Sequence, residues 1–306
     1  MKKKLIIIGG PTGVGKTNIS ISLAKKIDGE IISADSMQVY KYMDIGSDKA
    51  GEKERKEIPH HLLDVVSPME SFTVTNYKGL AEKKIKEIHE KGKIPILVGG
   101  TGLYIDSIIK NLSFASSKRD LNFRKELEAL AESKGNTYVH NMLKKVDPKA
   151  AESIHPNNLK RVIRALEVYK TTGKAFSSFK DDVKYNDSYD IYYYYLNRDR
   201  NELYRDINAR VEEMIKGGLL EEVKSLKDMG LTKDHISMMG IGYKEVLSYL
   251  EEEIDKEEML YLIKKNSRNY AKRQLTWFRR EEIAKELSKD LLSDSDIIDK
   301  IVEDIS

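Results

Sequence analysis

Apolar residues in the first hundred positions follow two alternating periods, which predict strands and helices in turn. Short uninterrupted apolar runs at Leu5–Ile8 and Ile94–Val98 are typical of strands buried on both faces of a parallel sheet, and Glu30–Ser33 is a further strand candidate. Apolar positions between residues 19 and 27 recur at helical spacing, and a lysine-rich helix is expected over Tyr77–Lys91. The alternation predicts an α/β protein whose parallel sheet is flanked by helices.

From about residue 116, charged helical periods replace this alternation. No clear strand interrupts them before the polar, aperiodic stretch Lys174–Ser188, which predicts a loop. The expected helices are Leu121–Ser133, Tyr138–Lys145 and Leu159–Thr171. We therefore predict a helical insertion domain over residues 116–186, within a core domain formed by residues 1–115 and 187–306.

The chain returns to the core domain at Asp190–Leu196, which contains four consecutive tyrosines, Tyr192–Tyr195. Such a run is suited to a platform for stacked nucleobases, but aromatic residues also favour strands. We favour a central strand of the core sheet. From Asn201 onward the sequence predicts a helical C-terminal part.

Composition narrows the class of protein. The 306 residues include no cysteine and carry a net charge of +3, so disulfides, thiolate metal sites and cysteine nucleophiles are excluded. The charged fraction of 34% exceeds the usual ~25% and indicates a densely charged surface. The first apolar run is too short for a signal peptide, and no stretch approaches the ~20 apolar residues of a membrane span. We expect a soluble cytoplasmic protein without a membrane partner.

A glycine-rich segment between the first predicted strand and helix fits the phosphate-binding pattern G-x-x-x-x-G-K-[ST]. Its residues are Gly10, Pro11, Thr12, Gly13, Val14, Gly15, Lys16 and Thr17. Glycines allow backbone N–H groups to surround phosphate oxygens, Lys16 brings a positive charge to the terminal phosphate, and the Thr17 hydroxyl is a ligand for Mg²⁺. The helix that follows adds the positive end of its dipole. This segment, the P-loop, predicts a phosphorylated ligand, as in ATP-binding and other nucleotide-binding proteins.

The second acidic residue that phosphoryl-transfer enzymes usually carry after a later strand is missing here. Ile94–Val98 runs into Gly99–Tyr104 with no acid at its end, and the first candidate is Asp35, after the second predicted strand. The carboxyl ends of parallel strands share one edge of a sheet, so we expect Asp35, Thr101 and the P-loop to converge. A helix N-cap is the alternative for Asp35, and the neighbouring phosphate site favours a chemical role.

A series of segments along nearly the whole chain resembles the motifs of the tRNA dimethylallyltransferases, also called tRNA isopentenylpyrophosphate transferases. These segments are Gly10–Thr17, Asp35–Tyr40, Pro59–Asp64, Gly99–Tyr104, Ile154–Asn157, Arg161–Glu167 and Tyr270–Arg279. Two places depart from the pattern: Ile45–Ala50 stands where a Gly-Thr-Ala-Lys-Pro-like segment is expected, and Met238-Met239 where Gln-Ala is more usual. Without cysteines the chain lacks the zinc finger of eukaryotic members and resembles the bacterial form.

The resemblance implies a P-loop NTPase-like fold and a prenyl-transfer reaction. In this family the P-loop holds the diphosphate of dimethylallyl diphosphate, and the dimethylallyl group is transferred to N6 of adenosine 37 in tRNA with release of diphosphate. Asp35 then corresponds to the general base and Thr101 to the threonine at the reacting centre. Arg210, otherwise an ordinary helix-surface arginine, would face the departing diphosphate together with Lys16 and Mg²⁺ on Thr17.

The expected partner is the anticodon stem-loop of tRNA, whose target base must leave its stack to react. The resemblance places Asp35, Ser36, Met37, Gln38 and Thr101 beside that base. Among them, Gln38 has both a donor and an acceptor for a purine edge.

Two basic segments are candidates for contacts with the RNA backbone. Lys264–Arg280 contains seven basic residues, no acid and interleaved aromatic residues, an arrangement suited to phosphates and stacked bases. Its candidates are Lys272, Arg273 and Arg279. The second segment lies in the insertion and comprises Lys160, Arg161, Val162, Ile163 and Arg164. A solvated helix face is the alternative for such charge runs, and we expect Trp277 in the core.

Other functions remain open at this point. His60-His61 suggest a metal site, but neighbouring side chains point apart and Asp64 is the only acid close by, which favours a structural or lining role. A small-molecule or nucleotide kinase would use ATP and leave the basic segment without a role. An RNA-binding NTPase switch would ignore prenyl diphosphates. We predict an Mg²⁺-dependent tRNA dimethylallyltransferase that acts as a monomer.

Overall fold

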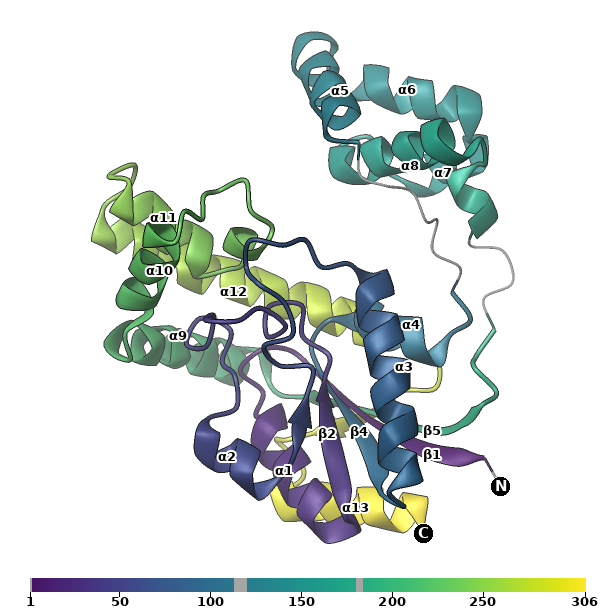
Figure 1. Cartoon of the computed structure of the whole chain (residues 1–306), viewed down its shortest axis with the longest axis vertical. Coiled ribbons are helices and arrows are strands. Elements are labelled where there is room, and N and C mark those ends of the chain that lie inside the picture. Colours follow the sequence, from purple (N-terminus) through teal and green to yellow (C-terminus); the bar gives the residue numbers. More distant parts are fainter. Residues whose placement is uncertain (1, 113–119, 180–183) are drawn as a thin grey trace. The chain divides into compact units, whose positions relative to one another are not determined.

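The computed structural model describes residues 2–112, 120–179 and 184–306 (Figure 1). Contacts between residues divide the chain into two units. Met1–Ile109 and Asn186–Ser306 form one, which we call the core unit, and Lys110–Tyr185 forms the other, the insertion unit. The domain boundary predicted at residues 115 and 116 lies outside the described residues.

One parallel sheet organises the core unit. In the described ranges it has six strands in the order β3-β2-β4-β1-β5-β6, and every pair is parallel. The strands are β1 (Lys3–Gly9), β2 (Gly29–Ser33), β3 (His60–His61), β4 (Ile94–Gly99), β5 (Tyr189–Asn197) and β6 (Lys285–Ser288). In the register, Gly9 lies between Gly99 and Tyr195, so β1 and β4 end at the same level of the carboxyl edge, and β5 continues to Asn197. The predicted parallel α/β fold is confirmed.

Helices cover both faces of this sheet (Figure 1). On one face α1 (Lys16–Ile27) packs against α13 (Asp294–Ile305), and Ile6 and Ile8 of β1 belong to the same buried cluster. On the other face α3 (Val74–Glu90) lies beside α4 (Gly102–Ile109). The remaining α-helices of the core unit are α2 (Glu52–Glu57), α9 (Arg200–Lys216), α10 (Leu219–Asp228), α11 (Tyr243–Leu250) and α12 (Lys256–Phe278).

The structure corrects the prediction at both edges of the sheet. β3 and β6 have two and four residues, too few to show a hydrophobic period, and β6 interrupts the region from Asn201 that was expected to be helical throughout. Each forms by pairing with a longer strand: Ile31 lies opposite His60, and Tyr194 opposite Lys285. Only the tertiary pairing reveals them.

The tyrosine run lies in β5, in the interior of the sheet as predicted. Tyr193, Tyr194 and Tyr195 are each at most 5% exposed. The ring of Tyr195 stacks on Phe278, and Tyr193 meets Phe278 edge-on. Burial on this scale excludes a platform for nucleobases.

The insertion unit is a small helical body with its own buried cluster, which includes Leu127, Leu143 and Val162. Its α-helices are α5 (Leu121–Lys134), α6 (Asn136–Val146), α7 (Pro148–Ser153) and α8 (Leu159–Thr172). The sequence did not predict α7, which has Asp147 as its N-cap and Pro148 in its first turn. Both residues are typical of a helix start, but the helix that they start is short.

Glu167 of α8 is a buried acid inside the insertion unit. The guanidinium of Arg124 donates to both of its carboxylate oxygens, at 2.8 and 2.6 Å, and Arg164 donates to one of them at 2.5 Å. Burial alone would raise the pKa of Glu167, but these hydrogen bonds lower it to about 2. The carboxylate is therefore charged and ties α5 to α8.

Within the ranges that the structure describes, no helix has both the length and the apolar character needed to cross a membrane.

Candidate active site

The P-loop connects β1 to α1. Gly10, Gly13 and Gly15 have positive φ angles of 146°, 79° and 86°, which glycine adopts without steric cost. Gly15 is the N-cap of α1, so the positive end of the helix dipole lies at the loop. The backbone has the conformation expected of an anion-binding loop.

Lys16 is the half-buried cation of this loop. Its Nζ donates to the carbonyl oxygens of Gly10 and Pro11, at 3.0 and 2.8 Å. Burial, together with the charge of Arg210, lowers the pKa of Lys16 to about 8, although Asp35 and Asp48 oppose the shift. An anion bound in the loop would stabilise the charged form of this ammonium.

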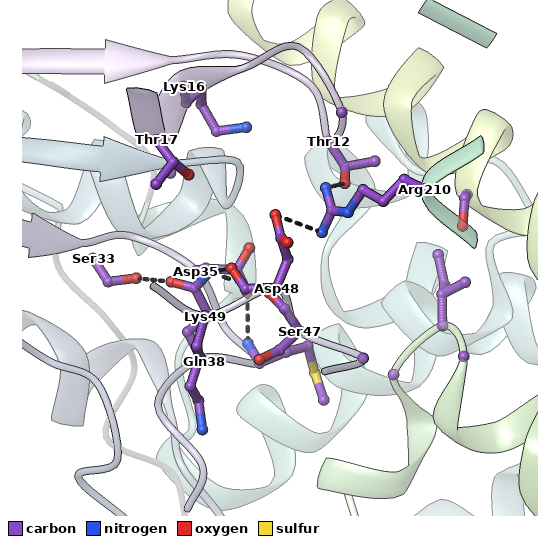
Figure 2. A pocket seen from close by; sticks show the side chains of 18 of the residues that line it. Thr12, Lys16, Thr17, Ser33, Asp35, Gln38, Ser47, Asp48, Lys49 and Arg210 are labelled. Atoms are coloured by element: carbon purple, nitrogen blue, oxygen red, sulfur yellow. Dashed lines mark hydrogen bonds and ion pairs between the residues drawn. The ribbon is translucent and has the colours of Figure 1, made fainter. Parts of the chain in front are cut away.

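A cavity of about 760 Å³ lies at the carboxyl edge of the sheet (Figure 2). The P-loop, the segment after β2 and the helices α9 and α12 all contribute to its lining. Among the predicted residues it is lined by Thr12, Gly13, Gly15, Lys16, Thr17, Asp35, Ser36, Met37, Gln38, Arg210 and Arg273. Gly10, Pro11, Val14, Thr101, Lys272 and Arg279 are not among the lining residues.

Asp35 and Thr101 meet beside the cavity, as the sheet topology predicted. The amide N–H of Met37 donates to Oδ1 of Asp35 at 2.8 Å. Residues 36–39 form a turn and not a helix, so the N-cap alternative for Asp35 is wrong. The Ser36 amide donates to Oγ1 of Thr101 at 3.0 Å. Thr101 thus fixes the loop that carries Asp35.

Arg210 extends from α9 to the P-loop (Figure 2). Its Nη1 donates to Oγ1 of Thr12 at 2.9 Å, and its Nη2 pairs with Oδ2 of Asp48 at 3.0 Å. The side chain is 22% exposed. These contacts exclude the alternative of an ordinary helix-surface arginine.

Gln38 lines the cavity, but its amide is already bonded within the protein. Oε1 accepts from the hydroxyl of Ser33 at 2.7 Å, and Nε2 donates to the carbonyl oxygens of Ser47 and Asp48 at 3.1 and 3.0 Å. In this state the side chain holds the segment that carries Asp48. Reading a purine edge would require these bonds to be exchanged.

Gln274 of α12 is a site residue that sequence reasoning missed. Its Oε1 accepts from the Thr12 amide and its Nε2 donates to the carbonyl oxygen of Gly100, both at 2.9 Å. A Cβ atom on Gly100 would lie 2.0 Å from that Nε2, so this close approach requires glycine. The one signal in the sequence was the position of Gln274 inside the motif Tyr270–Arg279.

Tyr270, which the sequence suggested only as one of the aromatic residues suited to stacked bases, lies one helical turn before Gln274. It lines the cavity, and its hydroxyl bonds to Thr101 and Gln274. Burial, reinforced by the charge of Asp35, raises the pKa of Tyr270 to about 12, although those hydrogen bonds oppose the shift. The residue is a neutral hydrogen-bonding group beside Asp35.

The basic residues in and directly after α12 differ in their contacts. Lys264 pairs with Glu212 at 2.7 Å and Arg268 bonds to Asn208 at 2.6 Å, so this part of the helix is tied to α9. Lys272, Arg273 and Arg279 are exposed.

The expectation that Trp277 belongs to the core is wrong. Trp277 is 41% exposed, whereas Phe278 is fully buried. The helical period places Phe278 on the inner face of α12 with Ala271 and Gln274. The indole instead covers Gly102, where a Cβ atom would lie 2.3 Å from it.

The basic segment of the insertion unit is only partly available to a ligand. Lys160 and Arg161 are exposed. Val162 and Ile163 are 0% and 2% exposed, so the prediction that they contact RNA needs correction: they build the core of the unit. Arg164 bonds to Glu167.

His60 and His61 have separate partners. His60 Nδ1 lies 2.7 Å from the carbonyl oxygen of Ile58, and His61 Nε2 lies 2.7 Å from Oε2 of Glu30. Among the described residues, no group of three or more His, Cys, Asp or Glu side chains is arranged to hold a metal ion. The hydrogen bonds support the structural interpretation of the pair.

The residues around Thr17 are compatible with Mg²⁺ bound together with a ligand. Mg²⁺ commonly keeps several waters and takes few protein ligands beside the oxygens of a bound phosphate. The Thr17 side chain lines the cavity next to Lys16 at the start of α1 (Figure 2). One hydroxyl and the oxygens of a diphosphate make a suitable donor set.

The parallel sheet and the P-loop define a P-loop protein. Residues 38–281 match the family model described as IPP transferase. The full-length tRNA isopentenylpyrophosphate transferase of Bacillus halodurans is 46% identical, with 99% of this chain and 94% of that chain covered and a TM-score of 0.71. The tRNA delta(2)-isopentenylpyrophosphate transferase of Staphylococcus epidermidis is 40% identical, with 99% of both chains covered and a TM-score of 0.73.

A eukaryotic dimethylallyltransferase acting on tRNA is 32% identical, with 98% of this chain and 78% of that chain covered and a TM-score of 0.80. The chain therefore belongs to the IPP transferase family, and the resemblance seen in its motifs is confirmed.

Proposed function

We propose that this protein transfers a dimethylallyl group from dimethylallyl diphosphate to N6 of adenosine 37, next to the tRNA anticodon, and releases diphosphate. Membership of the IPP transferase family supports the reaction class. The observation that carries the proposal is a single cavity lined by a P-loop, by Arg210 and by Asp35. An anion site and a potential base thus lie together, as the transfer requires.

The diphosphate is held at the P-loop end of the cavity. Loop amides, Lys16 and Arg210 supply positive charge there, and Thr17 would hold Mg²⁺, which would supply further positive charge to the diphosphate. Negative charge grows on the diphosphate as its bond to carbon breaks, so these groups bind the transition state more strongly than the ground state.

Asp35 accepts the proton from the N6 amine as the new bond between nitrogen and carbon forms. General-base catalysis of this kind typically contributes ~10²–10⁴-fold. Thr101 bonds to the amide of Ser36, and Tyr270 bonds to Thr101. Both residues therefore hold the loop around Asp35 in place. Carbon is attacked and not phosphorus, so the second acid of a kinase is not needed.

The RNA is held outside the cavity. Ser36 and Met37, which line the cavity, contact the extruded base in this proposal, and the exposed residues Lys272, Arg273 and Arg279 contact phosphates. Lys160 and Arg161 make the insertion unit a second tRNA-binding element. The protein acts as a monomer in this proposal, and the tRNA substrate supports a cytoplasmic enzyme.

The direct test is the release of diphosphate from dimethylallyl diphosphate, measured with and without tRNA. We expect release only when both tRNA and Mg²⁺ are present, together with prenylated adenosine among the tRNA nucleosides by mass spectrometry. Consumption of ATP with phosphorylation of an acceptor would instead identify a kinase. Nucleotide-dependent RNA binding without prenyl transfer would identify an NTPase switch.

A further inference from the structure

An acidic side chain lies inside the cationic part of the cavity. Asp48 lines the cavity with Lys16 and Thr12, and its Oδ2 lies 3.0 Å from Nη2 of Arg210 (Figure 2). The same guanidinium bonds to the P-loop through Thr12. A carboxylate is thus paired with a cation that faces the phosphate-binding loop.

Hydrogen bonds with two side chains fix the segment that carries this carboxylate. Glu222 of α10 accepts hydrogen bonds from the backbone amides of Asp44, Ile45 and Gly46, at 2.9, 2.8 and 3.1 Å. On the other side, Gln38 donates to the carbonyl oxygens of Ser47 and Asp48. Asp48 itself has a positive φ of 53°, a conformation that Asp and Asn tolerate better than most residues. The segment is therefore anchored from residue 44 up to Asp48 itself.

The cations around Asp48 are incompletely matched by protein partners. In the part of the chain that the structure describes, Nε of Arg210 is buried and makes no hydrogen bond. Arg210 lowers the pKa of Lys16, whereas Asp48 raises it, so Asp48 offsets part of the mutual repulsion of the two cations. Its side chain is 54% exposed, which leaves it room to move aside.

We propose that Asp48 is a resident anion that competes with diphosphate for Arg210. This inference rests on the proposed function and adds a control of affinity to it. In the free protein Asp48 holds Arg210 at the P-loop. When diphosphate binds, it replaces Asp48 as the partner of Arg210. The negative charge of Asp48 remains nearby and weakens the binding of diphosphate. The same repulsion promotes release of the product diphosphate after transfer.

The test compares Asp48→Asn with the full-length wild-type protein, using inorganic diphosphate with Mg²⁺ as the probe in calorimetric titrations. Asn retains the size and the backbone tolerance of Asp but not the charge. We expect diphosphate to bind Asp48→Asn about tenfold more tightly and to become a correspondingly stronger product inhibitor.

Asp44→Asn is the matched control. It removes one negative charge from the same segment, but Asp44 pairs with Lys49 and not with Arg210, so affinity should change less than about twofold. In an Arg210→Met background, Asp48→Asn should give no further gain, because the competition acts through Arg210.

Unchanged or weaker diphosphate binding by Asp48→Asn would overturn the inference, as would a gain of the same size in Asp44→Asn or in the Arg210→Met background. Thermal unfolding of each variant identifies any loss caused by misfolding. Failure of the wild-type protein and all variants to bind diphosphate would instead overturn the proposed function itself.

Discussion

The core unit and the insertion unit bring charged side chains together in different ways. In the core unit the contacts span most of the chain: Thr12 is bonded to Arg210 and to Gln274, from two helices that follow the insertion. In the insertion unit the charged centre joins neighbouring helices, since Arg124 of α5 and Arg164 of α8 meet Glu167. The charged side chains of the core unit line a cavity, whereas those of the insertion unit already bond to one another.

The comparison shows that basic residues of similar appearance in the sequence have different roles. Arg164 serves the stability of the insertion unit, because its partner is a buried carboxylate. Arg210 has a more exposed partner, Asp48, and lies against a P-loop. Whether a cation is available to a ligand depends on its partner in the protein and on how deeply that partner is buried.

The largest expected effect belongs to the core unit. Asp35→Asn keeps a side-chain oxygen that can accept from the Met37 amide, so the turn should remain. We expect the single-turnover rate of prenyl transfer to fall ~10²–10⁴-fold, because the base is lost, with unchanged affinity for tRNA and for dimethylallyl diphosphate. A wild-type rate in this variant would remove Asp35 from the reaction.

The second-largest effect is expected in the insertion unit. Arg124→Leu leaves Glu167 with one guanidinium in place of two and should cost about 3 kcal/mol of unfolding free energy in that unit. Chemical denaturation should show the insertion unfolding first, while diphosphate binding persists. Lys170→Ala, which removes an exposed pair with Asp120 and a contact with the Phe123 ring, is the control and should cost less than about 1 kcal/mol. Equal losses in the two variants would contradict the structural role of the buried acid.

A pH effect of intermediate size should arise from Lys16. Its lowered pKa of about 8 means that the free protein loses this charge as pH rises above 8, whereas the bound diphosphate favours the protonated form. Affinity for dimethylallyl diphosphate should therefore fall about tenfold between pH 7 and pH 9. Lys16→Ala should bind weakly at both pH values without this decline, while Lys25→Ala, on the exposed face of the same helix, should behave as wild type.

The smallest effects separate the two basic segments. Ala at Lys272, Arg273 or Arg279 should weaken tRNA binding and reduce the slope of log K against log salt by somewhat under one unit each, because fewer counterions are released. Lys160 and Arg161 should behave in the same way. Lys264→Ala is the control in α12, since Lys264 pairs with Glu212. Identical slopes in all the variants would make both segments ordinary solvated helix faces.

Local signals predicted much of the fold. Four strands, the P-loop and most helices have periods or motifs long enough to be recognised in the sequence. The predicted parallel topology then placed Asp35 and Thr101 at one edge of the sheet. β3 and β6 were missed because two and four residues have no period. Trp277 and Phe278 are adjacent, and only the packing of α12 shows which of them is buried.

The partners in the site could not be read from the sequence. Gln274 lies 262 positions from Thr12, and the pairing of Asp48 with Arg210 depends on how Glu222 and Gln38 anchor the segment between residues 44 and 48. A motif shows which residues belong to a site. It does not show which protein groups already occupy their hydrogen bonds, as the amide of Gln38 illustrates.

The most direct test of the account is to locate the prenyl group in tRNA after reaction with dimethylallyl diphosphate. Two tRNAs that differ only in having adenosine or guanosine at position 37 would be incubated with the protein, digested and sequenced by mass spectrometry. The account predicts one dimethylallyl group on N6 of adenosine 37 in the first tRNA and none in the second. Equal prenylation of both tRNAs, or of neither, would contradict it.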